Sequence, residues 1–355
     1  MTVILPERKT TLDSVQFLCY TLENNTFSGA DCSMAMKIGV IGSNFVSDWL
    51  CEAVQATGDF VLAAMYSRSQ ETGDAFAAKY GIPVVYTDME AFLSSDLDAV
   101  YIASPNFCHA SQSMDALRHG KHVLCEKPVA TSMAEWKAMQ QAAFENDRVL
   151  LEAMRPAFDP ALAFVQENLN QLGTIRRAVF EFCQYSSRYD RFKNGEILNA
   201  FNPAYGNAAI MDIGVYAVHV CAMLFGRPLD VQSQSVMLHN GMEGMGTIFM
   251  PYDGFQAQIV YAKIIDSVTP SIITGENGSI MINKLSVPSE ITIKMRGKDP
   301  EVFHFDAEPN NMIHQVRVFA DLIRRGDVHH KYQKTSAIEM EILDTVREQN
   351  GIVFA

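Results

Sequence analysis

The sequence predicts an α/β protein with two parts, a doubly wound parallel sheet followed by an α+β domain whose open sheet is mostly antiparallel. The first observation is an alternation between residues 37 and 128, where short apolar runs are separated by helical segments and short connections. Continuous apolar strands that alternate with helices are typical of parallel sheets covered on both faces. The second observation is a series of strand-like runs after residue 173, separated by Gly, Pro, Asn and Asp, which is typical of antiparallel strands.

The elements of the first half follow from the apolar runs and the turn residues beside them. We expect strands at residues 37–42, 60–67, 84–86, 98–105 and 121–128. Helices are expected at 45–57, 69–81, 88–95 and 111–120, where apolar residues recur at helical spacing. Gly81 ends the second of these helices, because glycine adopts left-handed backbone freely.

The second half begins with a helix expected at about 161–171, followed by a strand with alternating faces within 173–190. Further strands are expected within 231–238, 246–252, 255–264, 270–283 and 290–297. Helices at 311–326 and 335–349 should pack back against the two domains. The 355 residues leave room for two cores, and we place the domains at 36–155 and 156–355.

Residues 1–35 stand apart as an appendage that we expect to be disordered or loosely docked. They lack a basic n-region and contain only a short apolar run, so they make a poor secretory signal. Met34 and Met36 directly precede the first strand, and translation could begin there. We expect this segment to take no part in the chemistry.

The composition excludes several classes of partner. A net charge of −13 argues against nucleic acid or an anionic membrane, and the lack of an apolar run of about 18 residues argues against a transmembrane helix. Seven cysteines without a CxxC pair suggest reduced thiols in the cytoplasm. The close pair His119 and His122 spans an expected helix end and the next strand, which is poor ligand geometry, so we expect no metal site.

The turn after the first strand, "GSNFVS" at residues 42–47, stands where a dinucleotide-binding fold carries G-x-G-x-x-G. Only Gly42 matches, since Asn44 and Ser47 replace the other glycines. Asn44 tolerates left-handed backbone, and the amides of Ser43, Asn44 and Phe45 at a helix N-terminus would favour phosphate. A bare structural turn is the alternative.

The end of the second strand favours one cofactor over another. Folds that prefer NAD place an acidic residue there, whereas this chain has Ser67 and Arg68. A guanidinium and a hydroxyl suit a 2′-phosphate. We therefore expect NADP(H), with NAD(H) possible, although Arg68 could instead be a solvated surface residue.

Two further stretches follow the fourth and fifth strands, "ASPNFCH" at 103–109 and "CEKPVA" at 125–130. Ligands of open α/β sheets bind outside the carboxyl ends of the strands, so both should border the nicotinamide. The candidate residues are Ser104, Pro105, Asn106, His109, Glu126 and Lys127. Lys127 could be desolvated there and hold a positive charge where an alkoxide or phenolate develops, or it could be a surface lysine.

The stretch "MDIGVYAVH" at 211–219 places Asp212, Tyr216 and His219 on one face of an expected helix. Nothing within the stretch decides which of them handles a proton. Asp212 could orient a lysine or a substrate hydroxyl, or it could cap the helix.

In this order and with these separations, "KIGVIGS", "YSRS", "DAVYIASPNFCH", "GKHVLCEKPVA" and "MDIGVYAVH" resemble the Gfo/Idh/MocA oxidoreductase family. The resemblance covers nearly everything from residue 36 to 355, and the branch with dimeric dihydrodiol dehydrogenase and NADP-linked xylose dehydrogenase shares the "DIGVY" form. It implies a two-domain NAD(P)-dependent oxidoreductase with a Rossmann domain. The second domain's open sheet would form homodimer or larger homo-oligomer contacts.

The resemblance also implies roles for the candidate catalytic residues Tyr216, Lys127 and Asp212. Lys127 matches the lysine of E-K-P, and Tyr216 stands where related members carry the acid/base. A free tyrosine with a pKa of about 10 is a poor base near neutrality, but an adjacent lysine stabilises a phenolate. Asp212 would organise the pair, and His219 would be an interior or pocket-edge residue.

The expected reaction is hydride transfer between the nicotinamide and a small sugar, polyol, diol or dicarbonyl. Substrate-side candidates are Arg155, His219 and, at the domain junction, Tyr185, Arg188 and Tyr189, although a surface loop would also contain these last three. One alternative is a non-catalytic NADP(H)-binding regulatory protein, which has no need of both Lys127 and Tyr216. The other is a lyase or glycosidase that retains its cofactor.

Overall fold

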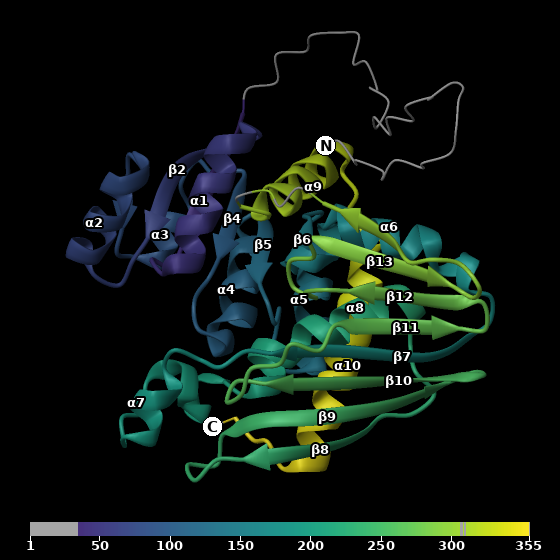
Figure 1. Ribbon diagram of the computed structural model, residues 1–355. Helices are drawn as coiled ribbons and strands as arrows, with labels where there is room; N and C mark the ends of the chain where they lie inside the picture. Colours follow the sequence, from purple (N-terminus) through teal and green to yellow (C-terminus); the bar gives the residue numbers. More distant parts are fainter. Residues whose placement is uncertain (1–34, 306–307, 309, 355) are drawn as a thin grey trace, which may run out of the picture.

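The computed structural model describes residues 35–305, 308 and 310–354, and its first part is the expected parallel sheet (Figure 1). Six parallel strands run in the order β3-β2-β1-β4-β5-β6, which is the doubly wound arrangement of dinucleotide-binding folds. They are β1 (Met36–Ile41), β2 (Phe60–Tyr66), β3 (Val85–Tyr86), β4 (Ala99–Ile102), β5 (His122–Glu126) and β6 (Leu150–Ala153). The sequence analysis had passed over β6.

Four of the five described helices of this part begin at side chains that satisfy free backbone amides. The five are α1 (Phe45–Thr57), α2 (Gln70–Tyr80), α3 (Met89–Leu93), α4 (Asn106–Arg118) and α5 (Met133–Glu145). Asn44, Ser69, Asp88 and Ser132 accept hydrogen bonds from amides in the first turns of α1, α2, α3 and α5. The helix α4 begins five residues earlier than expected, directly after Pro105, and α5 was not expected.

The second part is an eight-stranded sheet in the order β14-β13-β12-β11-β7-β10-β9-β8. Its only parallel pair is β7 with β10, so the sheet is mostly antiparallel, as predicted. Its strands are β7 (Ile175–Cys183), β8 (Gln232–Met237), β9 (Glu243–Tyr252), β10 (Phe255–Ala262), β11 (Ser271–Gly275), β12 (Gly278–Ile282), β13 (Glu290–Met295) and β14 (Glu301–His304).

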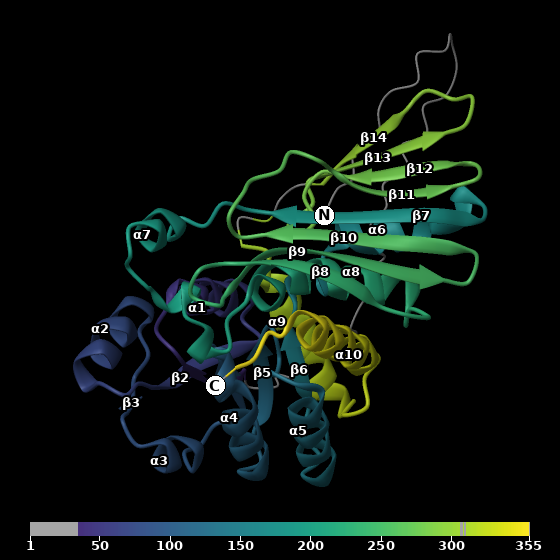
Figure 2. The ribbon, with the colours of Figure 1, turned by 90° about the horizontal axis from the view of Figure 1, so that it is seen from below.

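One face of this sheet packs on helices. Figures 1 and 2 show α6 (Pro160–Asn168), α8 (Val215–Phe225) and α10 (Tyr332–Asn350) along that face. Along β9 and β10, alternate residues such as Ile248, Met250, Ala257 and Ile259 are buried. The short α7 (Tyr189–Lys193) lies beyond the end of β7.

The two C-terminal helices pack back against the first part of the chain, as expected. Residues of α9 (Met312–Arg325), including Phe319, share a buried cluster with β1 and α1. The Phe319 ring stacks on Phe60 of β2, with centroids 5.6 Å apart. The helix α10 contacts α5, α8 and β6, so the chain's last helix joins both sheets.

One described segment, Pro203–Phe225, is long and apolar enough to cross a membrane by length and composition alone. Its most apolar window has a mean hydropathy of 1.8, but 78% of that window is buried inside the protein, as in a core helix. The sequence analysis had singled out no such segment. The appendage at residues 1–35 lies outside the described residues, apart from Ala35.

Candidate active site

A cavity of about 480 Å³ lies at the carboxyl ends of β1, β2 and β4. Seven residues expected to bind the cofactor line it, namely Gly42, Ser43, Asn44, Ser67, Arg68, Ser104 and Pro105. The lining also includes residues that the sequence analysis did not name, among them Tyr66, Ser69, Thr72, Phe107, Cys108, Gln112 and Asn199. Because Asn199 comes from the second part of the chain, that part contributes to the cavity wall.

The turn between β1 and α1 differs from the expectation about its backbone. The residue with left-handed backbone is Gly42, at φ +109°, whereas Asn44 is extended at φ −95°. The Asn44 side chain accepts from Val46 N and Ser47 N and donates to Ala103 O at 2.9 Å. A Cβ on Gly42 would lie 2.7 Å from Ala103 O, so glycine is required there while asparagine acts as the helix cap.

At the end of β2, polar side chains surround one corner of the cavity. Ser67 is nearly buried, and Ser69 caps α2. Arg68 lines the cavity and forms no salt bridge with another described residue. The corner therefore presents hydroxyls and a free guanidinium and no carboxylate.

Five residues expected at the cofactor, Lys127 among them, do not line this cavity. His109 is buried, and its ring nitrogens face Pro128 O at 2.8 Å and Ser104 O at 2.9 Å, so it ties the two strand-end loops together. Asn106 Nδ2 donates to Gly206 O. Glu126 accepts from the Tyr101 hydroxyl at 2.7 Å, and the exposed Phe45 ring meets Trp49 edge-on.

Lys127 lies beside Asp212 at the junction of the two sheets. Its Nζ donates to the Asp212 backbone carbonyl at 2.8 Å and to Oδ1 at 3.1 Å. Lys263, which follows β10, lies with Nζ 2.8 Å from Asp212 Oδ2. Burial alone would raise the pKa of the Asp212 carboxyl, but Lys263 and Lys127 hold that pKa well below its usual range. Asp212 is thus a carboxylate between two ammonium groups and not a helix cap.

The local backbone explains how Asp212 reaches both lysines. Residues Ile210–Gly214 form a π-helical turn that precedes α8, a distortion frequent at functional sites. A Cβ on Gly214 would lie 2.9 Å from Cγ of Tyr261, so only glycine lets the turn press this closely on β10. Because β10 ends at the residue before Lys263, this close approach places Lys263 beside Asp212.

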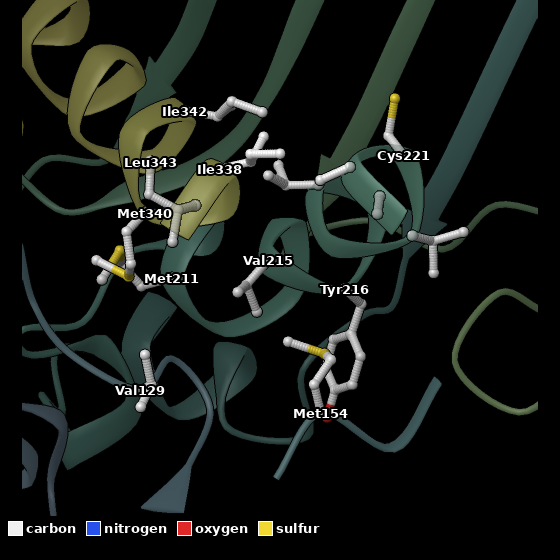
Figure 3. Close-up of a cluster of buried hydrophobic side chains, with 14 of the residues drawn as sticks. Val129, Met154, Met211, Val215, Tyr216, Cys221, Ile338, Met340, Ile342 and Leu343 are labelled. Atoms are coloured by element: carbon white, nitrogen blue, oxygen red, sulfur yellow. The ribbon is translucent and has the colours of Figure 1, made fainter. Parts of the chain in front are cut away.

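Tyr216 projects from the first turn of α8 away from the apolar contacts with α10, where Figure 3 shows Met211 and Val215. Lys127 Nζ lies 4.8 Å from the Tyr216 ring centroid, and Arg155 Nη2 lies 3.4 Å from the hydroxyl. Burial by itself lowers the pKa of Lys127 and of Arg155. The Tyr216 oxygen and nearby carboxylates have the opposite and larger effect, so both pKa values are raised. The Tyr216 side chain is therefore flanked by two groups that stay positively charged, Arg155 at the hydroxyl and Lys127 over the ring.

Arg155, a substrate-side candidate, is drawn into this site by aromatic and amide neighbours. Its guanidinium lies over the Trp49 ring of α1, 5.3 Å from the centroid, and reaches Asn311 Oδ1 at 3.4 Å. The other candidates from that region lie nearer to Lys263, because Ser186 N donates to Lys263 O and Tyr189 stacks on Phe201, whose ring lies 5.1 Å from Lys263 Nζ. Tyr185 donates to Asp190 and packs edge-on against Tyr189, while Arg188 is exposed before α7.

His219 points into the interior. Its Nδ1 lies 2.6 Å from Glu339 Oε2 and 3.8 Å from Glu152 Oε2, and all three side chains are almost fully buried. Glu152 also accepts from Val129 N and Ser336 Oγ. The three residues form the one described group of this size with metal-ligand spacing, and within it the His219 imidazole and the Glu339 carboxyl share a hydrogen bond.

The Glu339 carboxyl predicts a dependence of stability on pH. Burial raises its pKa from 4.5 to about 8, so the folded chain keeps a proton that the unfolded chain releases. This contribution to stability is present below pH of about 4.5 and is lost as the pH rises through about 8. Glu339→Gln should remove this contribution to stability. When the pH is raised from about 6 to about 9, the melting temperature of the variant should therefore fall less than that of the wild type. Parallel melting curves for both proteins would contradict this role.

The two histidines singled out for their spacing also have protein partners. His119 contacts Asp115 O and Glu90, and His122 Nδ1 accepts from Val149 N.

Lys263 is the main residue of the site that the sequence analysis missed. It follows an apolar strand, which also describes many solvated lysines, and no motif marks it.

Comparisons with known proteins show which family the chain belongs to. Residues 36–154 match the family model GFO_IDH_MocA, described as an oxidoreductase family with an NAD-binding Rossmann fold. The chain is 39% identical to scyllo-inositol 2-dehydrogenase (NADP(+)) IolU of Bacillus subtilis, over 90% of this chain and 98% of that protein. It is 24% identical to trans-1,2-dihydrobenzene-1,2-diol dehydrogenase of Mus musculus, again over 90% and 98%.

Among solved structures, the 3-ketoreductase KijD10 from Actinomadura kijaniata, in complex with NADP and TDP-benzene, superposes with a TM-score of 0.78. The match covers 89% of this chain and 98% of that one at 23% identity, and it shows the shared fold. Together with the extent of the likeness to IolU, the parallel sheet and the site at its carboxyl edge place this chain in the Gfo/Idh/MocA family of NAD(P)-dependent oxidoreductases.

Proposed function

We propose that this chain is an NADP(H)-dependent dehydrogenase or reductase that acts on a CH–OH group or the corresponding carbonyl of a small polyol or sugar. In this proposal, Tyr216 is the acid/base. The observation that carries it is the position of the Tyr216 side chain, with Arg155 at its hydroxyl and Lys127, which is bound to Asp212, over its ring. A buried phenol flanked by two fixed cations is suited to pass a proton to and from a substrate oxygen.

The residues of the cavity fit a dinucleotide. Gly42 has left-handed backbone and no room for a Cβ, as the first glycine of a dinucleotide-binding turn requires. The amides after Gly42 lie at the N-terminus of α1, which favours phosphate. Arg68, with Ser67 and Ser69 beside it, would hold a 2′-phosphate. When bound, the nicotinamide supplies or accepts the hydride.

Each site residue then has a defined task. Tyr216 gives a proton to the substrate oxygen during reduction and takes it during oxidation. Lys127 stabilises negative charge on the phenol oxygen and on the substrate oxygen. Asp212 is a positioning residue, because its carboxylate and its backbone carbonyl hold Lys127 Nζ.

The substrate class comes from relatives. IolU is named for an inositol, and a match over part of the chain is a D-xylose 1-dehydrogenase (NADP(+)) from Haloferax volcanii. A panel of inositols, aldoses, diols and dicarbonyls, tested with NADP(H) in both directions, identifies the substrate. Turnover without net change in reduced nicotinamide would instead favour a cofactor-retaining lyase or glycosidase, and NADPH binding without turnover would favour a regulatory protein.

Arg68→Gln tests the cofactor preference. Loss of a guanidinium facing a phosphate should raise the Kd for NADPH about 10- to 100-fold and change the Kd for NADH by less than about 3-fold. Fluorescence titration of both proteins with each dinucleotide measures this. Arg118→Gln, which removes an exposed arginine of α4, is the control. Tighter binding of NADH than NADPH by the wild type would overturn the preference.

We also propose that the open face of the second sheet forms a homodimer or larger homo-oligomer. Figure 1 shows described strands and no described helix on that face, and Val236 and Phe249 are exposed on neighbouring strands. Sedimentation showing a monomer at micromolar concentration would contradict this proposal.

A further inference from the structure

Lys263 is buried, and its ammonium group joins three parts of the structure. Nζ lies 2.8 Å from Asp212 Oδ2, donates to Ala200 O at 2.8 Å and lies 5.1 Å from the centroid of the Phe201 ring. A buried ammonium is tolerated only where charged and polar partners replace water. These contacts therefore fix the carboxylate of the site relative to residues 200 and 201.

Ala200 belongs to segment 199–206, which comes from the second part of the chain and contacts the cofactor cavity. Asn199 lines the cavity. At the other end of the segment, Gly206 O accepts from Asn106 Nδ2 at 3.1 Å, and the Tyr205 ring stacks on Phe107 with centroids 5.9 Å apart. The segment thus spans from Lys263 to the N-terminus of α4.

We propose that Lys263 is a positioning residue that couples the ordering of segment 199–206 over a bound dinucleotide to the orientation of Asp212 and, through it, of Lys127. The inference rests on the proposed function. A dinucleotide that contacts Asn199 stabilises the backbone at Ala200. The Ala200 carbonyl then holds Lys263 on Oδ2 of Asp212, which leaves Oδ1 directed at Lys127 Nζ.

Coupling of this kind is reciprocal, because a residue that stabilises the arrangement with bound dinucleotide affects both dinucleotide binding and the orientation of Asp212. Lys263→Met should therefore raise the Kd for NADPH about 10-fold and lower kcat at saturating NADPH about 10-fold. Since the loss of kcat passes through Asp212, Lys263→Met should add less than about 2-fold to the loss of kcat already caused by Asp212→Asn.

Asn240, which follows β8, provides a comparison because it binds the same segment. Its Nδ2 donates to Phe201 O at 2.8 Å, so it anchors the segment at residue 201 rather than through Asp212. Asn240→Ala should raise the Kd for NADPH but leave kcat at saturating NADPH within about 2-fold of the wild type. Lys121→Met is the stability control, because Lys121 also donates to two backbone carbonyls, those of Ser95 and Leu97, far from the site.

Hydrogen exchange followed with NADPH as the probe gives a readout that needs no substrate. In the wild type, NADPH should slow exchange of the amides of residues 199–206, and in Lys263→Met this protection should be lost at saturating NADPH. Equal protection in both proteins, an unchanged kcat, or additive losses with Asp212→Asn would overturn the coupling. Failure of the wild type to bind NADPH would instead refute the proposed function, so the two failures are distinguishable.

Discussion

Replacing Tyr216 by phenylalanine is expected to lower kcat by about 100-fold or more while the Kd for NADPH stays within about 2-fold of the wild type. The change removes one oxygen atom and keeps the ring, which packs edge-on against Phe182. The substrate oxygen then has no acid at the place where Lys127 and Arg155 concentrate positive charge. Steady-state rates with the best substrate of the panel, and NADPH titration of the same preparations, measure the two effects.

The matched control for this change is Tyr252→Phe. Tyr252 is also buried, and its hydroxyl donates to Gly226 O at the opposite end of α8 from Asp212. This variant should keep its kcat. A Tyr216→Phe enzyme that turns over at a near-normal rate would show that another group moves the proton.

Lys127→Met should also lower kcat by about 100-fold or more. The change removes the cation that lies over the Tyr216 ring and leaves Asp212 held by Lys263 alone. Methionine keeps most of the volume of the side chain and cannot carry charge. The Kd for NADPH should change little, because Lys127 does not line the cavity, and stopped-flow rates of hydride transfer should show the loss at the chemical step.

Melting temperature separates this effect from damage to the fold. Lys121→Met removes a lysine that is also partly buried and bound to backbone carbonyls, so it should lower stability and leave kcat unchanged. If Lys127→Met changed only KM, Lys127 would bind substrate equally in the ground and transition states, and the assignment as electrostatic catalyst would be wrong.

The sequence predicts the architecture well, because most strands can be recognised from local apolar runs and the turn residues beside them. The buried parallel strands are continuous apolar runs, and helix ends such as those near Gly58 and Gly81 are marked by glycines with positive φ. Of the elements that were missed, α5 has 13 residues and an ordinary serine cap, whereas the two missed strands are short. Four-residue β6 and β14 offer little periodicity, and α4 begins early because Pro105 suits a helix start better than a strand end.

The residues of the candidate site also fall into two groups, those that the sequence predicts and those that it does not. Gly42, Arg68 and Lys127 occupy strand ends, which a parallel sheet brings to one edge whatever the details of packing. Two other features depend on contacts between distant segments. Lys263 meets Asp212 only because Gly214 admits a close approach to Tyr261, and the π-helical turn changes the face that simple helical spacing assigned to Asp212, Tyr216 and His219.

The central claim is that Tyr216, and not His219, passes the proton. It is tested most directly by comparing kcat of Tyr216→Phe and His219→Ala on the same substrate, with each rate divided by the concentration of NADPH-binding sites. This division removes the effect of unfolded protein, which matters because His219 is bonded to buried Glu339. The tyrosine variant should lose at least about 10-fold more activity per site than the histidine variant. A larger loss in the histidine variant would contradict the account.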